Sequence, residues 1–134
     1  MSGNKCFFDH NMSPRLARAL GELEGKRGVH VEHLRERFPT SISDIEWIKI
    51  LSDEGGWFVV TEDNQIKQQK YERKAWLESG LPFVFLAGTW GNLKLWEEAW
   101  RFIKYWPKVK ESINFHKPNT SFELSIYGKI TIVK

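Results

Sequence analysis

The sequence predicts an α/β fold in which helices flank a mainly parallel central sheet and a β-hairpin follows at the C-terminus. Short, continuously apolar segments at residues 5–8, 57–61 and 83–86 are typical of strands covered on both faces. Amphipathic helical patterns separate these segments, and this alternation favours parallel strands joined by helical crossovers. The apolar pattern near the C-terminus alternates about Gly128 instead, which is typical of a hairpin.

The first elements follow one another closely. A strand at 5–8 is followed by Ser13-Pro14, which supplies an N-cap and a first-turn proline for a helix ending at Gly25. A second, less regular strand is expected over 29–34. The later elements are a helix at about 44–54, a strand at 57–61, a helix at about 69–79, a strand at 83–86 and hairpin strands at 122–127 and 129–133.

The C-terminal third contains a tryptophan-rich helix. Leu93, Trp96, Trp100 and Ile103 recur at helical spacing and predict a helix that ends before Pro107. This stripe is expected to pack on the core, while Trp90 and Trp106 flank it and are expected to be exposed. Exposed aromatic side chains are enriched at protein interfaces, so a homodimer or capture of a partner protein is one interpretation. The other is that all the tryptophans belong to the core.

The 134 residues have room for one domain, 1–134, with a core at about 5–90 and the C-terminal helix and hairpin at about 93–134. No apolar run approaches the ~20 residues that span a bilayer, and the first residues lack a signal-peptide pattern. We therefore expect a cytoplasmic protein without a membrane partner. The single cysteine, Cys6, is expected to be a buried strand residue.

Charge is divided unequally along the chain. Residues 1–66 carry 8 Lys/Arg against 11 Asp/Glu, whereas residues 67–134 carry 12 against 6. A basic half can bind phosphates, and clustered carboxylates in an acidic half can hold a divalent metal. An ordinary solvated surface explains the same charges.

Two aspartates stand where ligand sites form in parallel sheets. Asp9 and Asp63 each follow a buried strand, and ligands bind outside the carboxyl ends of such strands. If the two strands are neighbours, both carboxylates can reach one ion. Since Asp is also common in turns after strands, either residue alone could simply begin a turn.

Helical geometry adds Asp44. At about 100° per residue, Trp47 and Leu51 lie within about 60° of Asp44, which places this carboxylate on the apolar face. Burying a charge is costly unless the charge is paired or binds metal. The alternative is a helix cap involving Ser41. Glu46 falls about 160° away, where a capping box with Ser43 accounts for it.

Other polar residues are weaker candidates. Glu72 shares a helical face with Trp76, so it is either a fourth carboxylate of the site or half of a buried ion pair. Asn11 and Asn64 stand beside the strand-end aspartates and could orient water, or could simply form turns.

The segments Phe7-Phe8-Asp9-His10-Asn11-Met12, Ser43-Asp44-Ile45-Glu46-Trp47-Ile48 and Val59-Val60-Thr61-Glu62-Asp63-Asn64 together resemble the PIN-like nucleases. Within that family the chain resembles the VapC-like toxins of type II toxin–antitoxin systems, over about residues 5–90. The resemblance implies a three-layer PIN-like fold and a metal-dependent endoribonuclease that binds Mg²⁺ or Mn²⁺ and has a cognate antitoxin. It places the catalytic, metal-binding acids at Asp9, Asp44 and Asp63.

The chain departs from this family behind the third acid, where Asn64 and Gln65 stand in place of a further Asp. Glu46 or Glu72 could replace it as a metal ligand, or one metal could suffice. Basic residues near these acids are candidates for guiding RNA, or form a solvated helix surface: Arg15, Arg18, Lys67, Lys70, Arg73 and Lys74.

Two rival functions share the same pattern. A receiver-like phosphoacceptor domain also places carboxylates at strand ends, but it requires an acidic pair after the first strand and a late lysine, neither of which is present. A PIN-like interaction module without catalytic activity would retain the acids for structural reasons alone.

Overall fold

The computed structural model describes residues 4–133. Its strands are β1 (Lys5–Phe8), β2 (His30–His33), β3 (Trp57–Thr61), β4 (Phe83–Leu86), β5 (Ser121–Leu124) and β6 (Ile130–Val133). Its helices are α1 (Pro14–Glu24), α2 (Leu34–Arg37), α3 (Asp44–Glu54), α4 (Gln65–Gln68), α5 (Lys70–Ser79), the 3₁₀ turn η1 (Gly88–Asn92) and α6 (Leu95–Phe115).

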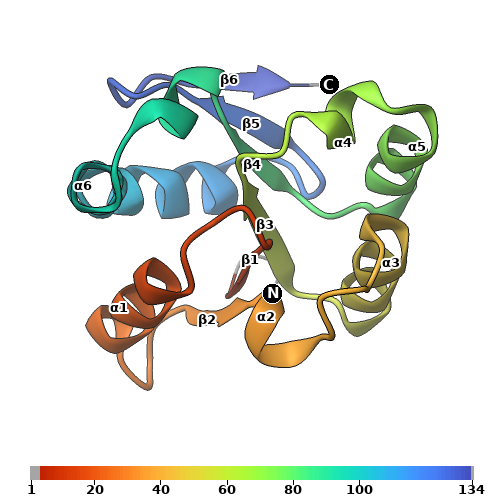
Figure 1. Cartoon of the computed structure of the whole chain (residues 1–134), viewed down its shortest axis with the longest axis horizontal. Coiled ribbons are helices and arrows are strands. Elements are labelled where there is room, and N and C mark those ends of the chain that lie inside the picture. The colour runs from red at the N-terminus through yellow and green to blue at the C-terminus, as the bar shows by residue number, and fades with distance from the viewer. Residues whose placement is uncertain (1–3, 134) are drawn as a thin grey trace.

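The six strands form one sheet in the order β2-β1-β3-β4-β5-β6. All neighbouring pairs are parallel except β5 and β6, which are antiparallel. Helices α1 and α6 cover one face and α3 and α5 cover the other, which gives three layers (Figure 1). The predicted α/β class and mainly parallel sheet are therefore confirmed.

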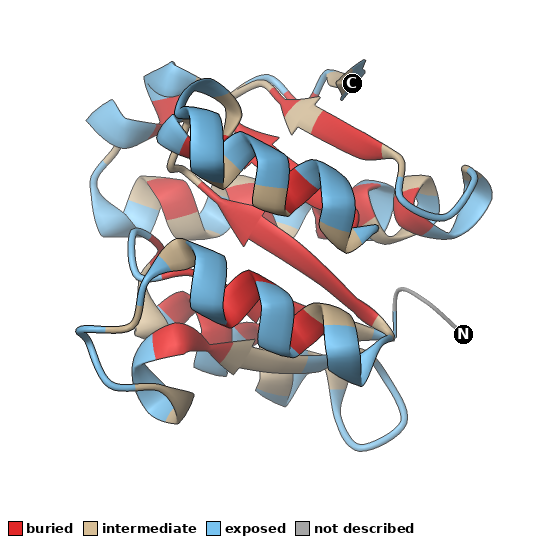
Figure 2. Ribbon diagram, turned by 90° about the vertical axis from the view of Figure 1, so that its right-hand side faces the viewer, coloured by how far each residue is buried: buried red, intermediate tan, exposed pale blue. Residues whose placement is uncertain are grey.

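Alternate strand residues supply two separate hydrophobic cores. On the α1 and α6 face, Phe8 and Phe58 pack with Leu16 and Phe102. On the α3 and α5 face, Phe83 packs with aromatic and aliphatic side chains of those helices. Figure 2 shows the sheet buried between layers whose outer surfaces are exposed. Coverage on both faces explains why these strands are continuously apolar.

The hairpin joins the main sheet, because β5 pairs in parallel with β4 before the chain turns back into β6. Gly128 in this turn has a φ of 87°, which favours glycine. A Cβ atom at Gly128 would lie 2.7 Å from the ring of Tyr105, so the close approach of α6 also requires glycine. The Tyr105 hydroxyl donates to the Ile126 carbonyl at 2.8 Å and fixes the hairpin against α6.

The predicted end of the tryptophan-rich helix was wrong. Helix α6 continues through Pro107 to Phe115, although proline cannot donate to the Ile103 carbonyl and costs about 3 kcal/mol inside a helix. Val109 and Ile113, beyond the proline, are buried in the same core as the first half of the helix. Burial of this second half offsets the local cost, which explains the continuation.

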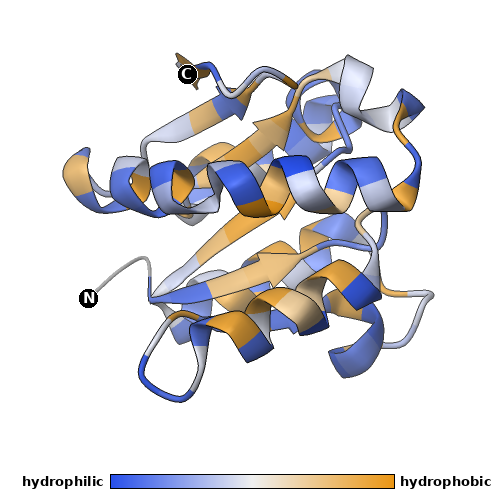
Figure 3. Ribbon diagram, turned by 90° about the vertical axis from the view of Figure 1, so that its left-hand side faces the viewer, coloured by the Kyte–Doolittle hydropathy of each residue, from blue (hydrophilic) through white to orange (hydrophobic). Residues whose placement is uncertain are grey.

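The predicted exposure of the tryptophans was also wrong. Trp90 and Trp106 are buried, with 0% and 5% of their surfaces exposed, whereas Trp96 is 88% and Trp100 is 51% exposed. The buried face of α6 is set by its full length and runs through Glu98, Phe102, Trp106, Val109 and Ile113. Figure 3 shows α6 lying over the sheet with polar and apolar residues both on its outer surface.

Within residues 4–133, no helix has the length and apolar character needed to cross a membrane.

Candidate functional site

The carboxyl ends of β1 and β3 form the edge of the sheet at which the predicted acids meet. These strands are neighbours in register, with Phe8 opposite Val60. The Asp9 amide extends the pairing by donating to the Val60 carbonyl at 3.4 Å. Asp9 follows β1 and Asp63 follows β3, so the two acids stand at the ends of adjacent strands, as the strand-end argument predicts.

Asp9 is fully buried and held in a defined position. Its Oδ1 accepts the Asn11 amide at 3.2 Å, and its Oδ2 accepts the Thr61 hydroxyl. Asn11 thus acts through its backbone, while its side chain is exposed. Thr61 was not predicted as a site residue. Its position opposite the first acid could have been found only from the strand register.

Thr61 also positions the third acid. Its Oγ1 accepts the Asp63 amide at 2.8 Å, so one hydroxyl contacts both strand-end aspartates. Asp63 Oδ1 in turn accepts the Gln65 amide at 2.9 Å, which forms the turn into α4. Asp63 therefore begins a turn and is also connected to Asp9 through the Thr61 hydroxyl. Asn64 caps α4 without a side-chain hydrogen bond.

Asp44 is the first residue of α3 and is half-buried, as its helical face predicts. Its Oδ1 accepts the Trp47 indole N–H at 2.9 Å. Burial raises the pKa of Asp44, and the negative charges of Asp63 and Glu72 raise it further. Asp44 therefore lies within range of the charges of Asp63 and Glu72.

The negative charges of Asp63 and Asp44 also act on Asp9. Burial raises the pKa of Asp9 to about 7, and the charges of Asp63 and Asp44 contribute, while the Thr61 and Asn11 hydrogen bonds oppose the shift. No Lys or Arg forms an ion pair with Asp9, Asp44 or Asp63 in the part of the chain that the structure describes. The site accordingly concentrates negative charge that no Lys or Arg of residues 4–133 compensates by an ion pair.

The donor set suits a hard divalent cation, because carboxylate oxygens are the ligands that Mg²⁺ and Mn²⁺ prefer. A cation would also supply the countercharge that Asp9 lacks. Among residues 4–133, however, no three His, Cys, Asp or Glu side chains are close enough together to hold an ion as they stand. The acids lie at one edge of the sheet, but their carboxylates are too far apart to coordinate one ion without moving.

The two glutamates proposed as additional ligands differ in position. Glu72 is half-buried and acts on Asp44 through its charge. Glu46 is exposed, and it forms a capping box in which its carboxylate accepts the Ser43 amide at 3.0 Å. The structure supports the capping interpretation of Glu46 and does not bring its carboxylate to the other acids.

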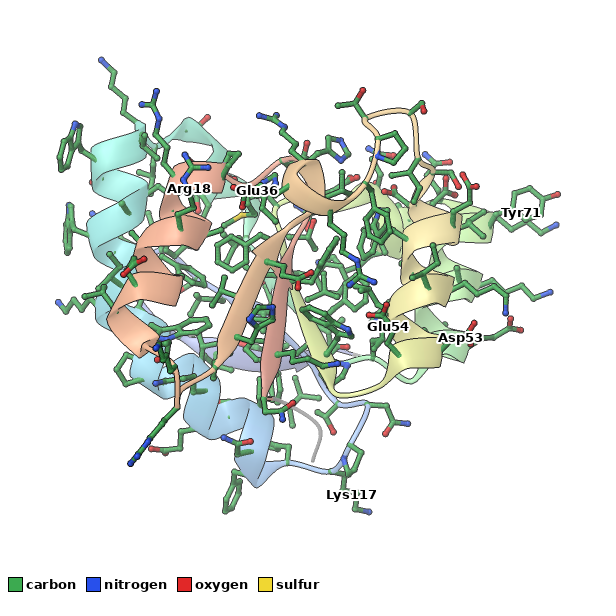
Figure 4. The ribbon with its side chains drawn as sticks, turned by 90° about the horizontal axis from the view of Figure 1, so that it is seen from below. Arg18, Glu36, Asp53, Glu54, Tyr71 and Lys117 are labelled. Carbon is green, nitrogen blue, oxygen red and sulfur yellow. The ribbon has the colours of Figure 1, made fainter. Side chains whose placement is uncertain are left out.

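The candidate RNA-guiding cations also differ. Lys67 is half-buried and paired with Glu123 at 3.2 Å, so its charge is already compensated. Arg18 pairs with Glu36 at 3.0 Å, as the two labelled side chains in Figure 4 show. Arg73 donates to the Lys67 carbonyl but remains exposed. The remaining candidates are exposed: Arg15, Lys70 and Lys74.

Beside these acids, the structure forms an open cavity of about 620 Å³ that sequence analysis did not predict. Its lining includes His10, Arg35 and Leu95, together with the carboxylates of Glu62 and Glu98. Burial raises the pKa of Glu98 to about 7, and the neighbouring Glu62 adds to the shift. Only tertiary structure places these two glutamates together, because they are 36 positions apart in the sequence.

His33 holds the loop that carries Asp9. Its Nε2 donates to the Met12 carbonyl at 2.7 Å, and its Nδ1 accepts the Arg35 amide at 3.0 Å. Burial lowers the pKa of His33, which favours this neutral form. The Arg35 side chain also donates to the His10 carbonyl at 3.1 Å. The end of β2 therefore fixes the loop after β1.

The raised pKa of Asp9 predicts the pH dependence of stability. Between about pH 4 and about pH 7, Asp9 is protonated in the folded protein but ionised in the unfolded chain. The free energy of unfolding therefore falls as pH rises through this range. We expect chemical denaturation of the metal-free protein to show a lower free energy of unfolding at about pH 8 than at about pH 5. An Asp9→Asn variant should show a smaller decrease. An identical decrease in both proteins would contradict the assignment of this effect to Asp9.

A family model described as a PIN like domain matches residues 4–88, which is more than half of the chain. The matched range contains β1 to β4 and the three aspartates Asp9, Asp44 and Asp63. Comparison with curated proteins gave no significant match, and neither did comparison with solved structures.

Proposed function

The chain belongs to the PIN-like domain family, and we propose that it is a cytoplasmic metal-dependent endoribonuclease that hydrolyses RNA phosphodiester bonds. PIN-like domains are generally nucleases. The observation that carries the proposal is the arrangement of Asp9, Asp44 and Asp63 at the carboxyl edge of the sheet without a basic partner among the described residues.

In this proposal Asp9, Asp44 and Asp63 bind Mg²⁺ or Mn²⁺, with Glu72 near enough to add negative charge. When bound, the ion supplies a water of lowered pKa and neutralises charge on the phosphate. Thr61 fixes the Asp9 carboxylate and the backbone of Asp63. Because the Asp9 carboxylate is already fixed, fewer groups have to move when the three carboxylates bind an ion.

RNA binding is proposed at the exposed cations near this edge. Arg15 lies in the first turn of α1, which directly follows the Asp9 loop. Lys70, Arg73 and Lys74 lie in α5, which follows Asp63. Lys67 is a weaker candidate because Glu123 compensates its charge. These side chains would contact the phosphates of the RNA backbone rather than its bases.

Metal binding can be tested without measuring cleavage. Mg²⁺ or Mn²⁺ should raise the melting temperature, because a ligand that binds only the folded state stabilises it. The increase should be larger at about pH 8 than at about pH 6, where protons compete for Asp9. Asp63→Asn should abolish the increase, and Glu46→Gln, which alters a carboxylate outside the site, should preserve it. An unchanged increase in Asp63→Asn would exclude the proposed ligand set.

A narrower proposal is that the nuclease is the toxin of a toxin–antitoxin pair and is inhibited by a cognate antitoxin. Expression of the chain alone should then arrest growth, and Asp9→Asn should relieve the arrest. Coexpression with the product of a neighbouring small open reading frame should also restore growth. Normal growth on expression of an active nuclease would contradict the toxin role.

A non-catalytic PIN-like interaction module is the second candidate. The observation that favours it is the absence, among residues 4–133, of three acids already within reach of one ion. A homodimer would be a natural partner arrangement for such a module. The thermal-shift measurement separates the two candidates, because a structural role of the acids predicts no response to Mg²⁺ or Mn²⁺.

A further inference from the structure

The outer surface of the first half of α6 contains aromatic side chains that are largely exposed. Trp96 is 88% exposed and Trp100 is 51% exposed, one helical turn apart. Tyr127, at the tip of the hairpin, is 81% exposed. Trp96, Trp100 and Tyr127, with the cations Arg101 and Lys104, are called the α6 aromatic surface below.

Arg101 lies against two of these rings, Trp100 and Tyr127, and is itself held by hydrogen bonds. Its guanidinium carbon lies 5.0 Å from the ring centre of Trp100 and 6.0 Å from that of Tyr127. The guanidinium donates to Glu97 at 3.0 Å and to the Ile126 carbonyl at 2.8 Å. The hairpin tip and α6 are thereby fixed relative to each other, and the rings of Trp100 and Tyr127 lie on either element beside one guanidinium.

The surface is basic as well as aromatic. Lys104 lies 5.9 Å from the ring centre of Trp100, and Lys94 is exposed one residue before α6 begins. Glu97, the acid beside these rings, is already paired with Arg101. The remaining charge favours an anionic partner.

The α6 aromatic surface adjoins the candidate active site. Helix α6 begins after β4 and η1, at the carboxyl edge of the sheet. Leu95, the residue before Trp96, lines the same cavity as His10 and Asn11 of the Asp9 loop. A chain bound at the acids and extending across this cavity would reach Trp96 next.

We propose that the α6 aromatic surface binds a single-stranded segment of RNA by stacking bases on Trp96 and Trp100. This inference rests on the proposed nuclease function. Base stacking on aromatic rings together with nearby cations is the general means by which proteins hold single strands. A second copy of the chain fits less well, because a two-fold interface would bring the Lys94 and Lys104 cations of two copies together.

The test measures binding in the Asp9→Asn background, where cleavage is removed. The probe is a fluorescein-labelled single-stranded RNA of about ten nucleotides, a length within the range of known single-strand sites. Trp96→Ala should weaken binding roughly ten- to a hundredfold in Kd, and Trp96→Phe should restore most of the affinity. Phe115→Ala is the matched control, since Phe115 is 82% exposed at the far end of the same helix, and its Kd should not change.

Two further measurements separate stacking from charge. A duplex of the same sequence should bind more weakly, because paired bases cannot stack on the tryptophans. Lys104→Gln should lower the salt dependence of log K by about 0.7, the value for one phosphate contact in a single strand.

The outcomes are distinguishable. If Trp96→Ala and Trp100→Ala bind the RNA with the same Kd as the Asp9→Asn protein that carries them, the inference is overturned. Equal affinity for the duplex and the single strand would also overturn it. If the wild-type chain still cleaves RNA in that case, the proposed function stands alone. Light scattering that shows a dimer, dissociated by Trp96→Ala, would assign the surface to a second copy instead. RNA binding that depends on Trp96 in a chain without nuclease activity would refute the proposed function alone.

Discussion

Asp9→Asn is expected to reduce metal-dependent RNA cleavage more than about a hundredfold, since even residues that only support metal ligands contribute 10- to 100-fold. The neutral amide keeps the size of Asp9. Its oxygen can still accept the Asn11 amide, and its NH₂ group can donate to Thr61 Oγ1. It removes a carboxylate from the centre of the proposed ligand set. Cleavage of a labelled RNA with and without Mg²⁺ measures the effect.

The same substitution should stabilise the metal-free protein at about pH 8, by on the order of 2 kcal/mol. The sign follows from the pKa of Asp9, which burial raises to about 7, so that the ionised form is unfavourable in the folded state. A loss of activity with increased stability cannot be explained by unfolding.

Asp53→Asn is the matched control for this prediction. Asp53 lies on the exposed side of α3, and Figure 4 shows its side chain pointing outward. Its pair with Lys49, at 3.6 Å, is exposed and contributes little. This variant should cleave RNA at the parent rate. Full activity in Asp9→Asn would refute the proposed nuclease mechanism.

Trp106→Ala is expected to lower the free energy of unfolding by about 3–5 kcal/mol, as is usual for buried large aromatic residues. The ring packs against Phe58 and Phe102, with ring centres 6.0 and 5.7 Å apart. Its indole N–H also donates to Glu24 at 2.8 Å, which connects α6 to the end of α1. Chemical denaturation monitored by circular dichroism measures the loss.

Trp96→Ala supplies the comparison, because it removes the same side chain from an exposed position on the same helix. It should change stability by less than about 0.5 kcal/mol, as is typical of surface substitutions. Similar losses for Trp96→Ala and Trp106→Ala would contradict the orientation of α6. If Trp106→Ala fails to fold, Trp106→Phe should fold with a smaller loss.

The longer elements of the first two-thirds of the chain could be predicted from the sequence because their signals are local. Continuous apolar segments identified β1, β3 and β4, and Ser43 with Glu46 marked the start of α3. Asp9, Asp44 and Asp63 could also be chosen from such signals. Asp9 and Asp63 come within two residues of a strand end, and Asp44 begins a helix whose periodicity places it on the apolar face.

The short helices α2 and α4 and the turn η1 were not predicted, because segments of four or five residues carry too little periodicity. The prediction of which face of α6 is buried failed for a different reason. Its sequence contains two alternative apolar stripes, Trp96-Trp100-Ile103 and Phe102-Trp106-Val109. Only contact with Phe58 and Phe8 determines which stripe is buried.

The longer strands and helices, and the three aspartates that carry the proposed chemistry, could be predicted from the sequence, because apolar periodicity within an element and the residues that follow a strand are local signals. Tertiary structure alone decided that Thr61 contacts Asp9 and that Glu62 meets Glu98. It also decided that Trp96 remains exposed. Each of these features depends on which elements pack against one another. Burial, desolvation and the proximity of charges arise from contacts between residues far apart in the sequence, so no local pattern encodes them.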